Sequence, residues 1–114
     1  MSDIEIRDDR AAGRLEAVAG DEVVGRIEYF VLDAPATAFV PVHTIVEPAH
    51  EGQGIAGSLA RELYATAERE GVTVAPLCPY VVKWAERHPD EAPAADPALL
   101  RAAKDWLKAH PGRF

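Results

Sequence analysis

The chain of 114 residues lacks the features that would tie it to disulfides, metals or membranes. Its one cysteine, Cys78, excludes an internal disulfide and is typical of a protein in a reducing cytoplasm. Cys78 and four scattered histidines have no zinc-ligand spacing, so we expect no metal site. No apolar run approaches the length of a membrane span, and the acidic start MSDIEIRDD does not resemble a signal peptide. Together these absences predict a cytoplasmic protein.

Clusters of basic residues are also absent. The chain has 12 Lys and Arg against 19 Asp and Glu, a net charge of −7. Because nucleic acids and anionic membranes are bound through clustered Lys and Arg, we expect neither as a partner. Hydrophobic residues at 48% and charged residues at 27% are ordinary for a globular protein, and the length suits one domain with one core.

The first half of the chain has the alternation of apolar and polar residues that strands require. Strands are expected over residues 4–7, 14–18, 23–32 and 37–46. Residues 19–22, Ala-Gly-Asp-Glu, form a turn signal that makes the second and third strands a hairpin. Pro41 lies inside the fourth strand and cannot donate a ladder hydrogen bond, so a bulge or a local edge is expected there.

The second half of the chain has helical periodicity interrupted by one short strand. Apolar residues recur at helical spacing over 54–70, and Gly71 supplies the C-terminal stop. A short buried strand is expected over 72–75. A second helix then begins at Pro79 and ends at Pro89, with Val81, Trp84 and Ala85 on one face.

The order of these elements predicts an α+β fold, in which an antiparallel meander continues into a βαβ crossover and forms a mixed sheet. We expect one domain over residues 1–90 and a linker over 91–95, where the sequence becomes Glu-Ala-Pro-Ala-Ala. Asp96-Pro97 is expected to cap an extra amphipathic C-terminal helix within 96–114, which packs on the same domain through apolar residues such as Leu99 and Trp106.

The most informative segment is 43–59, HTIVEPAHEGQGIAGSL. Here a strand passes through Gly52-Gln53-Gly54 into the start of a helix. The first backbone N–H groups of a helix have no intrahelical partner, and together with the helix dipole they form a site for a phosphate or pyrophosphate. Glycine lets the anion come close to the backbone. The segment therefore predicts a phosphorylated cofactor.

Two common glycine-rich loops fit this segment poorly. The mononucleotide P-loop ends in Gly-Lys-Ser/Thr, whereas Gly54 is followed by Ile55-Ala56. The dinucleotide loop follows the first strand of a domain. Gly52 and Gly54 fit its first glycines and Gly57 takes the sixth position, but this loop comes after several strands. No acidic residue ends a second parallel strand about twenty residues later.

A third pattern, Arg/Gln-x-x-Gly-x-Gly/Ala, is the acyl-CoA pyrophosphate loop of the GNAT superfamily, and residues 51–56 match it at every position except the first. Residues 4–90 resemble the small stand-alone GNAT-like N-acetyltransferase domains. The matching residues are His43-Thr44, Gly52-Gln53-Gly54-Ile55-Ala56, Pro76, Cys78-Pro79-Tyr80-Val81 and His88-Pro89. The resemblance implies a GNAT-like fold, acetyl-CoA as the acyl donor, and an amine acceptor that is a small molecule or a protein.

The resemblance also implies where acetyl-CoA binds. The fourth and fifth strands splay apart, and backbone groups of Ile45 and Val46 bind the pantetheine arm. The pyrophosphate loop comprises Glu51, Gly52, Gln53, Gly54, Ile55 and Ala56. Two residues depart from the family pattern. Glu51 replaces Arg or Gln and brings a carboxylate near the pyrophosphate. Trp84 takes the place of a Tyr general acid and cannot donate a proton as a phenol does.

Two side chains are candidates for catalysis. Cys78 precedes Pro79 at a helix start, where the dipole and free amides stabilise a thiolate, so it is either an acyl acceptor or a small buried thiol. His43 shares a strand face with Phe39 and Ile45, and it is either the base that deprotonates an ammonium or a hydrogen-bonded residue at a strand end.

The leading hypothesis is acetyl transfer to a primary amine; the alternative is a CoA-binding or protein-interaction module with little catalysis.

Overall fold

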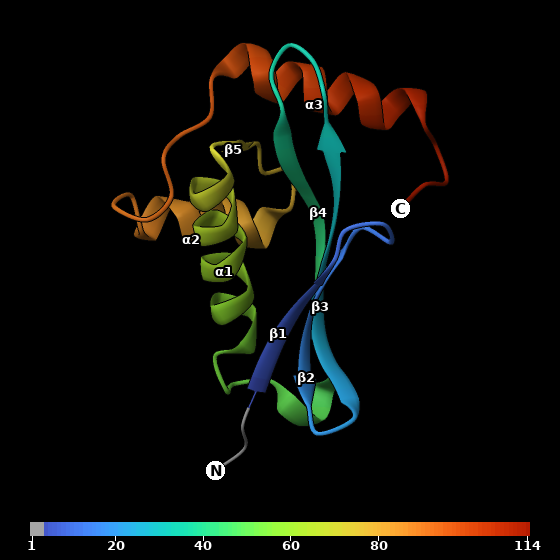
Figure 1. Cartoon of the computed structure of the whole chain (residues 1–114), viewed down its shortest axis with the longest axis vertical. Coiled ribbons are helices and arrows are strands. Elements are labelled where there is room, and N and C mark those ends of the chain that lie inside the picture. Colours follow the sequence, from blue (N-terminus) through green and yellow to red (C-terminus); the bar gives the residue numbers. More distant parts are fainter. Residues whose placement is uncertain (1–3) are drawn as a thin grey trace.

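A computed structural model describes residues 4–114 (Figure 1). Residues 1–3, which the expected first domain includes, lie outside the described part. The strands are β1 (Ile4–Asp9), β2 (Arg14–Ala19), β3 (Glu22–Leu32), β4 (Ala38–Val46) and β5 (Thr73–Val74). The helices are α1 (Ile55–Glu70), α2 (Pro79–Arg87) and α3 (Pro97–Ala109), with a short 3₁₀ turn, η1 (Pro48–His50), before α1. No helix within residues 4–114 is long and apolar enough to cross a membrane.

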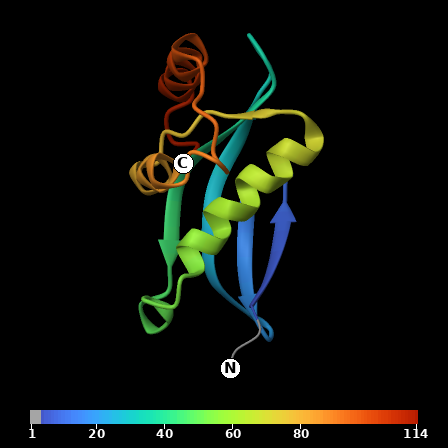
Figure 2. The same ribbon diagram turned by 90° about the vertical axis from the view of Figure 1, so that its left-hand side faces the viewer.

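The five strands form one mixed sheet in the order β1-β2-β3-β4-β5. β1 to β4 are antiparallel neighbours, and β5 pairs parallel with β4 after the crossover through α1. The predicted α+β meander followed by a βαβ crossover is therefore confirmed. Figure 2 shows α1 running diagonally across one face of the sheet. We call this the α1 face and the opposite one the α3 face.

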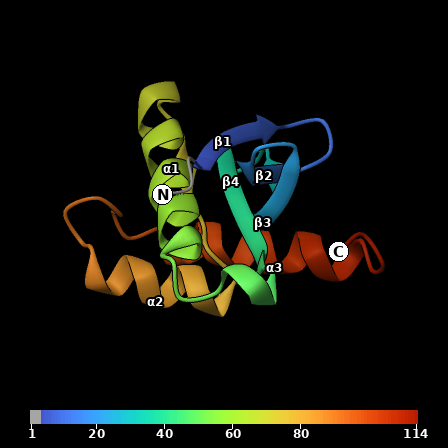
Figure 3. The ribbon, with the colours of Figure 1, turned by 90° about the horizontal axis from the view of Figure 1, so that it is seen from below.

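Each face of the sheet carries its own core. On the α1 face, Ile27, Tyr29 and Phe39 pack with Leu59 and Leu63 of α1 and with Val81 and Trp84 of α2. On the α3 face, Phe30 and Val40 pack with Leu99 and Ala103 of α3. The ring of Phe30 stacks on Trp106 at a centroid distance of 4.1 Å. Seen from below (Figure 3), α1 and α3 lie on different sides of the strands.

The helix boundaries follow from the capping signals in the sequence. Gly71 ends α1 with φ 71°, a left-handed conformation that favours glycine, and its N–H donates to the carbonyls of Ala67 and Glu68. Asp96 begins α3, because its Oδ1 accepts a hydrogen bond of 2.8 Å from the Ala98 N–H. Both predicted caps are confirmed.

A bulge in β4 confirms the expectation at Pro41 and changes which side chains face each core. Tyr29 lies opposite Pro41 and Glu28 opposite His43, so Val42 is the extra residue. Phe39 contacts Tyr29 on the α1 face, whereas His43 lies opposite Glu28 and therefore faces the other way. The expectation that His43 shares a face with Phe39 is wrong, because the bulge shifts the alternation by one residue.

The boundaries at 1–90, 91–95 and 96–114 remain a prediction, and the packing of α3 suggests how they can be tested. Leu99 is 5% exposed in the core of the α3 face. We expect Leu99→Ala to lower the free energy of unfolding by about 2–4 kcal/mol through lost burial and a residual cavity. Lys104→Ala, an exposed change on the same helix, should alter it by less than about 0.5 kcal/mol. Urea denaturation followed by far-UV circular dichroism measures both, and equal stability of the two variants would contradict a structural role for α3.

Candidate active site

β4 and the chain that follows β5 stay paired only as far as Pro41. The Ala75 N–H donates to the Phe39 carbonyl at 2.9 Å. The N–H groups of Leu77 and Cys78 both donate to the Pro41 carbonyl, at 3.1 and 3.0 Å. Among the described residues, no backbone hydrogen bond joins β4 to this segment beyond Pro41. β4 continues to Val46 while α2 begins, so the second half of β4 has a free edge.

Hydrogen-bonded and non-hydrogen-bonded residue pairs alternate along β3 and β4, and this alternation identifies the backbone groups on the free edge. The Glu47 N–H donates to the Val24 carbonyl at 2.8 Å, so Glu47 belongs to a hydrogen-bonded pair. Such pairs alternate along an antiparallel ladder. Ile45, opposite Arg26, therefore directs its backbone groups toward β3, whereas Thr44 and Val46 direct theirs toward the free edge.

The glycine-rich loop leads into α1 with a row of unpaired backbone donors. Gly52 has φ 81° and Gly54, the N-cap of α1, has φ 78°. A Cβ on Gly54 would meet no atom within 4 Å, so the backbone conformation, not lack of room, requires glycine there. Within the described residues, the N–H groups of residues 52–57 donate no backbone hydrogen bond, and no side chain caps α1. Such a row of donors at a helix N-terminus suits a phosphate group.

An open pocket of about 240 Å³ lies over this loop. It is lined by Val46, His50, Glu51, Gly52, Gly54, Ile55, Ala56, Gly57 and Tyr80. Ile55 is only 4% exposed, so its side chain belongs to the core and its backbone is the part available to a ligand. Glu51 and Gln53 are exposed, and Glu51 forms no salt bridge among residues 4–114. His50 Nδ1 is buried without a hydrogen-bond partner in the described chain.

Tyr80 is a pocket residue that the sequence analysis did not select. It lies in the first turn of α2 and is 40% exposed. A Cβ built on Gly57 would lie 3.5 Å from the Tyr80 hydroxyl, which brings this hydroxyl to the first turn of α1. The only sequence signal was its place in the Cys-Pro-Tyr-Val run. Tyr80 connects the start of α2 to the glycine-rich loop.

Cys78 is the N-cap of α2, as its place before Pro79 predicts. It is 3% exposed, and a hydrogen bond of 3.2 Å joins its Sγ to Thr44 Oγ1. Cys78 and Thr44 therefore lie where β4 and α2 begin to diverge. Thr44 has Ile27 as its ladder partner, which puts Thr44 on the α1 face. Sequence reasoning missed Thr44 as a contact of Cys78.

His43 lies apart from Cys78, on the α3 face. Its side chain is exposed, and its ladder partner is Glu28. No hydrogen bond joins His43 to Cys78 in the described part of the chain. The β4 strand thus separates the two predicted catalytic side chains. A group that reacts with both would have to meet them at the free edge of β4.

Trp84 and Tyr64 form a stacked pair in the core between α1 and α2. Trp84 is 6% exposed and lies between Tyr64, at a centroid distance of 5.8 Å, and His88, at 4.2 Å. Burial raises the pKa of Tyr64 to about 12, so its phenol is neutral at neutral pH. The indole of Trp84 packs against Tyr64 and His88, and it has no phenolic proton to donate.

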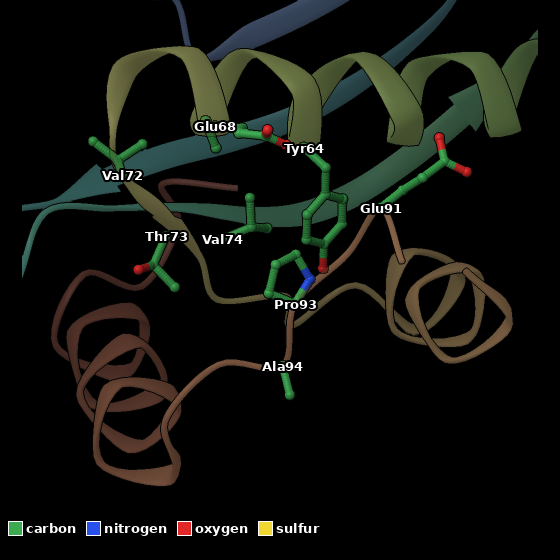
Figure 4. Close-up of a pocket in the computed structure, with 9 residues that line it drawn as sticks. Tyr64, Glu68, Val72, Thr73, Val74, Glu91, Pro93 and Ala94 are labelled. Carbon is green, nitrogen blue, oxygen red and sulfur yellow. The ribbon is translucent and has the colours of Figure 1, made fainter. Parts of the chain in front are cut away.

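A second pocket, of about 280 Å³, lies at the C-terminal half of α1 (Figure 4). Tyr64 points into it, and Glu68 and Glu91 lie at its rim. Its lining has no basic side chain and the Glu68 carboxylate repels an anion, so this pocket does not suit a phosphorylated cofactor. No group of three or more His, Cys, Asp or Glu side chains within residues 4–114 is arranged to hold a metal ion.

Comparison with solved structures identifies similar folds. One is a ribosomal-protein-alanine N-acetyltransferase from Brucella melitensis biovar Abortus 2308, with 27% identity and a TM-score of 0.56. The match covers 73% of this chain, which spans 62% of the length of that protein. Another is an aminoglycoside acetyltransferase from an uncultured soil metagenomic sample, in complex with trehalose. It has 15% identity and a TM-score of 0.51, and the match covers 97% of this chain and 70% of the other. At 15% identity, the match to the aminoglycoside acetyltransferase shows only that the two proteins share a fold.

No curated protein sequence matches this chain significantly. The family described as GCN5-related N-acetyl-transferase matches residues 14–94. That range contains β2 to β5, α1, α2, the glycine-rich loop and Cys78. The chain therefore belongs to the GCN5-related N-acetyltransferase family.

Proposed function

We propose that this chain transfers the acetyl group of acetyl-CoA to a primary amine on a small molecule or a protein. The observation that carries the proposal is the row of unpaired backbone N–H groups over residues 52–57, at the positive end of α1 and beside the free edge of β4. The similar Brucella protein is named as an N-acetyltransferase, which supports an amine acceptor.

The cofactor would lie along the free edge of β4 and end at the glycine-rich loop. The backbone amides of Gly52, Gln53, Gly54, Ile55 and Ala56 would bind the pyrophosphate. Val46 and Thr44, rather than Ile45, would bind the pantetheine arm, because only their backbone groups point away from β3. Tyr80 would flank the arm on its other side.

Bound acetyl-CoA supplies an activated thioester. The amine nitrogen bonds to the acetyl carbon, the carbon–sulfur bond breaks, the amine loses a proton and the thiolate gains one. The exposed imidazole of His43, whose ladder partner is Glu28, is suited to take the proton from the incoming ammonium. Since Trp84 is buried and has no phenolic proton, the proton for the thiolate must come from another group.

The burial of Cys78 favours direct transfer over an acyl-cysteine intermediate. A nucleophile must meet the thioester carbon, yet Cys78 is 3% exposed and its Sγ is hydrogen-bonded to Thr44.

A CoA-binding module with little catalysis is the second candidate function. The exposed carboxylate of Glu51 at the loop entrance and the absence of a phenol at Trp84 favour it. Acetylation of an amine separates the two functions.

The glycine-rich loop provides a test of CoA binding. We expect Gly54→Val to weaken CoA binding at least about tenfold, or about 1.4 kcal/mol, because valine disfavours φ 78° and places a branched side chain near the pyrophosphate. Gly71→Val is the matched control, since Gly71 also has a positive φ, 71°, with no atom within 4 Å of an added Cβ, but lies at the opposite end of α1. Isothermal titration calorimetry measures both. Equal affinity of Gly54→Val and parent, or no CoA binding by the parent, would overturn the proposal.

The carboxylate at the loop entrance gives a second prediction. Glu51→Arg should raise CoA affinity by about 1 kcal/mol at low salt, because it replaces repulsion of the pyrophosphate by attraction across solvent. The gain should shrink as salt is added. Glu68→Arg makes the same charge change near the other end of α1 and should leave affinity nearly unchanged. If the two variants bind CoA equally well, Glu51 does not face the ligand.

The base and the thiol can be tested separately. His43→Gln should lower kcat/KM for the amine by about 100-fold and leave CoA affinity unchanged, because it removes only the proton acceptor. His110→Gln, at the C-cap of α3, serves as the control. Under direct transfer, mass spectrometry after incubation with acetyl-CoA should find no acetyl group on Cys78. An acetylated Cys78 that passes its acetyl group to the amine would contradict direct transfer, and full activity of His43→Gln would exclude His43 as the base.

A further inference from the structure

A row of alternating charge crosses the α3 face and ends at His43. The strand register places Asp9, Arg14, Glu28 and His43 opposite one another on β1, β2, β3 and β4. Paired residues point to the same side of a sheet. The predicted base is therefore the last member of a row that begins at the far edge of the sheet, and Glu28 and Arg14 are the side chains that an acceptor would meet before it.

A pocket of about 310 Å³ lies over the middle of this row. It is lined by Ala12, Gly13, Arg14, Glu28, Arg113 and Phe114. Gly13 holds the β1–β2 turn against β3, because its carbonyl accepts from the Tyr29 N–H at 2.8 Å. A Cβ at Gly13 would clash with the Tyr29 carbonyl oxygen. The Phe114 ring lies 5.8 Å from Phe30, so the chain after α3 forms the opposite wall.

The charges in this pocket favour an anionic group. Arg113 forms no salt bridge within residues 4–114, and its guanidinium lies 5.8 Å from the Trp106 ring. Arg14 has only a long contact of 3.9 Å to Glu16. The Glu28 carboxylate, by contrast, is bound by Arg26 at 2.9 Å. Arg14 and Arg113, whose guanidinium groups make no close salt bridge within the described chain, therefore both line the pocket, and guanidinium pairs well with carboxylate.

We propose that this pocket binds a carboxylate on the acceptor and so positions the acceptor's amine at His43, an inference that rests on the proposed acetyl transfer. Arg14 and His43 are two strand spacings apart, about 10 Å. The acceptor must therefore carry its amine at the end of an aliphatic chain that starts from the carboxylate, as an ω-amino acid does.

Binding can be tested without catalysis by titrating the ¹⁵N-labelled chain with 5-aminopentanoate and with pentylamine, which differ only in the carboxylate. The carboxylate should tighten binding about tenfold or more, and the shifted signals should include Gly13, Arg14, Glu28 and Arg113. Arg113→Gln should abolish the difference between the two amines. Lys108→Gln removes a cation from α3 and should preserve it. Equal binding of the two amines, or shifts confined to other residues, would overturn the inference.

Catalysis then separates this inference from the proposed function. With acetyl-CoA, kcat/KM should be about tenfold higher for 5-aminopentanoate than for pentylamine, and Arg113→Gln should remove that gain while pentylamine is acetylated as before. Equal kcat/KM values would overturn the acceptor pocket and leave acetyl transfer intact. Tight binding of 5-aminopentanoate in a chain that does not bind CoA would overturn the proposed function and leave the carboxylate pocket intact.

Discussion

The rest of the site depends on the way β4 parts from its neighbour at Pro41. The Pro41 carbonyl accepts hydrogen bonds from both Leu77 and Cys78, while its ring has no N–H to donate. The parallel pairing ends at this carbonyl and α2 begins. Opposite it, the extra residue Val42 interrupts the ladder with β3. One proline thus marks both the end of a parallel pairing and a bulge, and the remainder of β4 is left with an unpaired edge.

The same bulge divides the chemistry between the two faces of the sheet. Thr44 and Cys78 lie toward the α1 face, where the glycine-rich loop and α1 supply donors for an anion. His43 lies on the α3 face with Glu28, beside a pocket that carries two weakly paired guanidinium groups. In the proposed reaction the acyl donor and the amine approach from different sides and meet at the edge of β4. The α3 helix has a part in this arrangement, because Trp106 stacks on Phe30 and supports the chain that walls the pocket.

Local signals in the sequence predicted most of the fold, because each acts within a few residues. Gly71 and Asp96 cap helices wherever the surrounding chain goes, and the turn at residues 19–22 defines the β2–β3 hairpin by itself. The face of His43 could not be predicted, since it depends on a bulge whose position is set by pairing with β3. Thr44 and Tyr80 were missed for a similar reason. Their contacts with Cys78 and Gly57 exist only once α2 packs beside β4 and α1.

The central claim is that CoA binds to the unpaired amides at the start of α1 and along the free edge of β4. Its most direct test is the change in the ¹H–¹⁵N spectrum of the chain as CoA is added. We expect the amide signals of Gly52, Gly54 and Ala56 to shift together with those of Thr44 and Val46, while the residues around Tyr64 stay unchanged. Shifts confined to the Tyr64 pocket, or no shifts at saturating CoA, would contradict the claim.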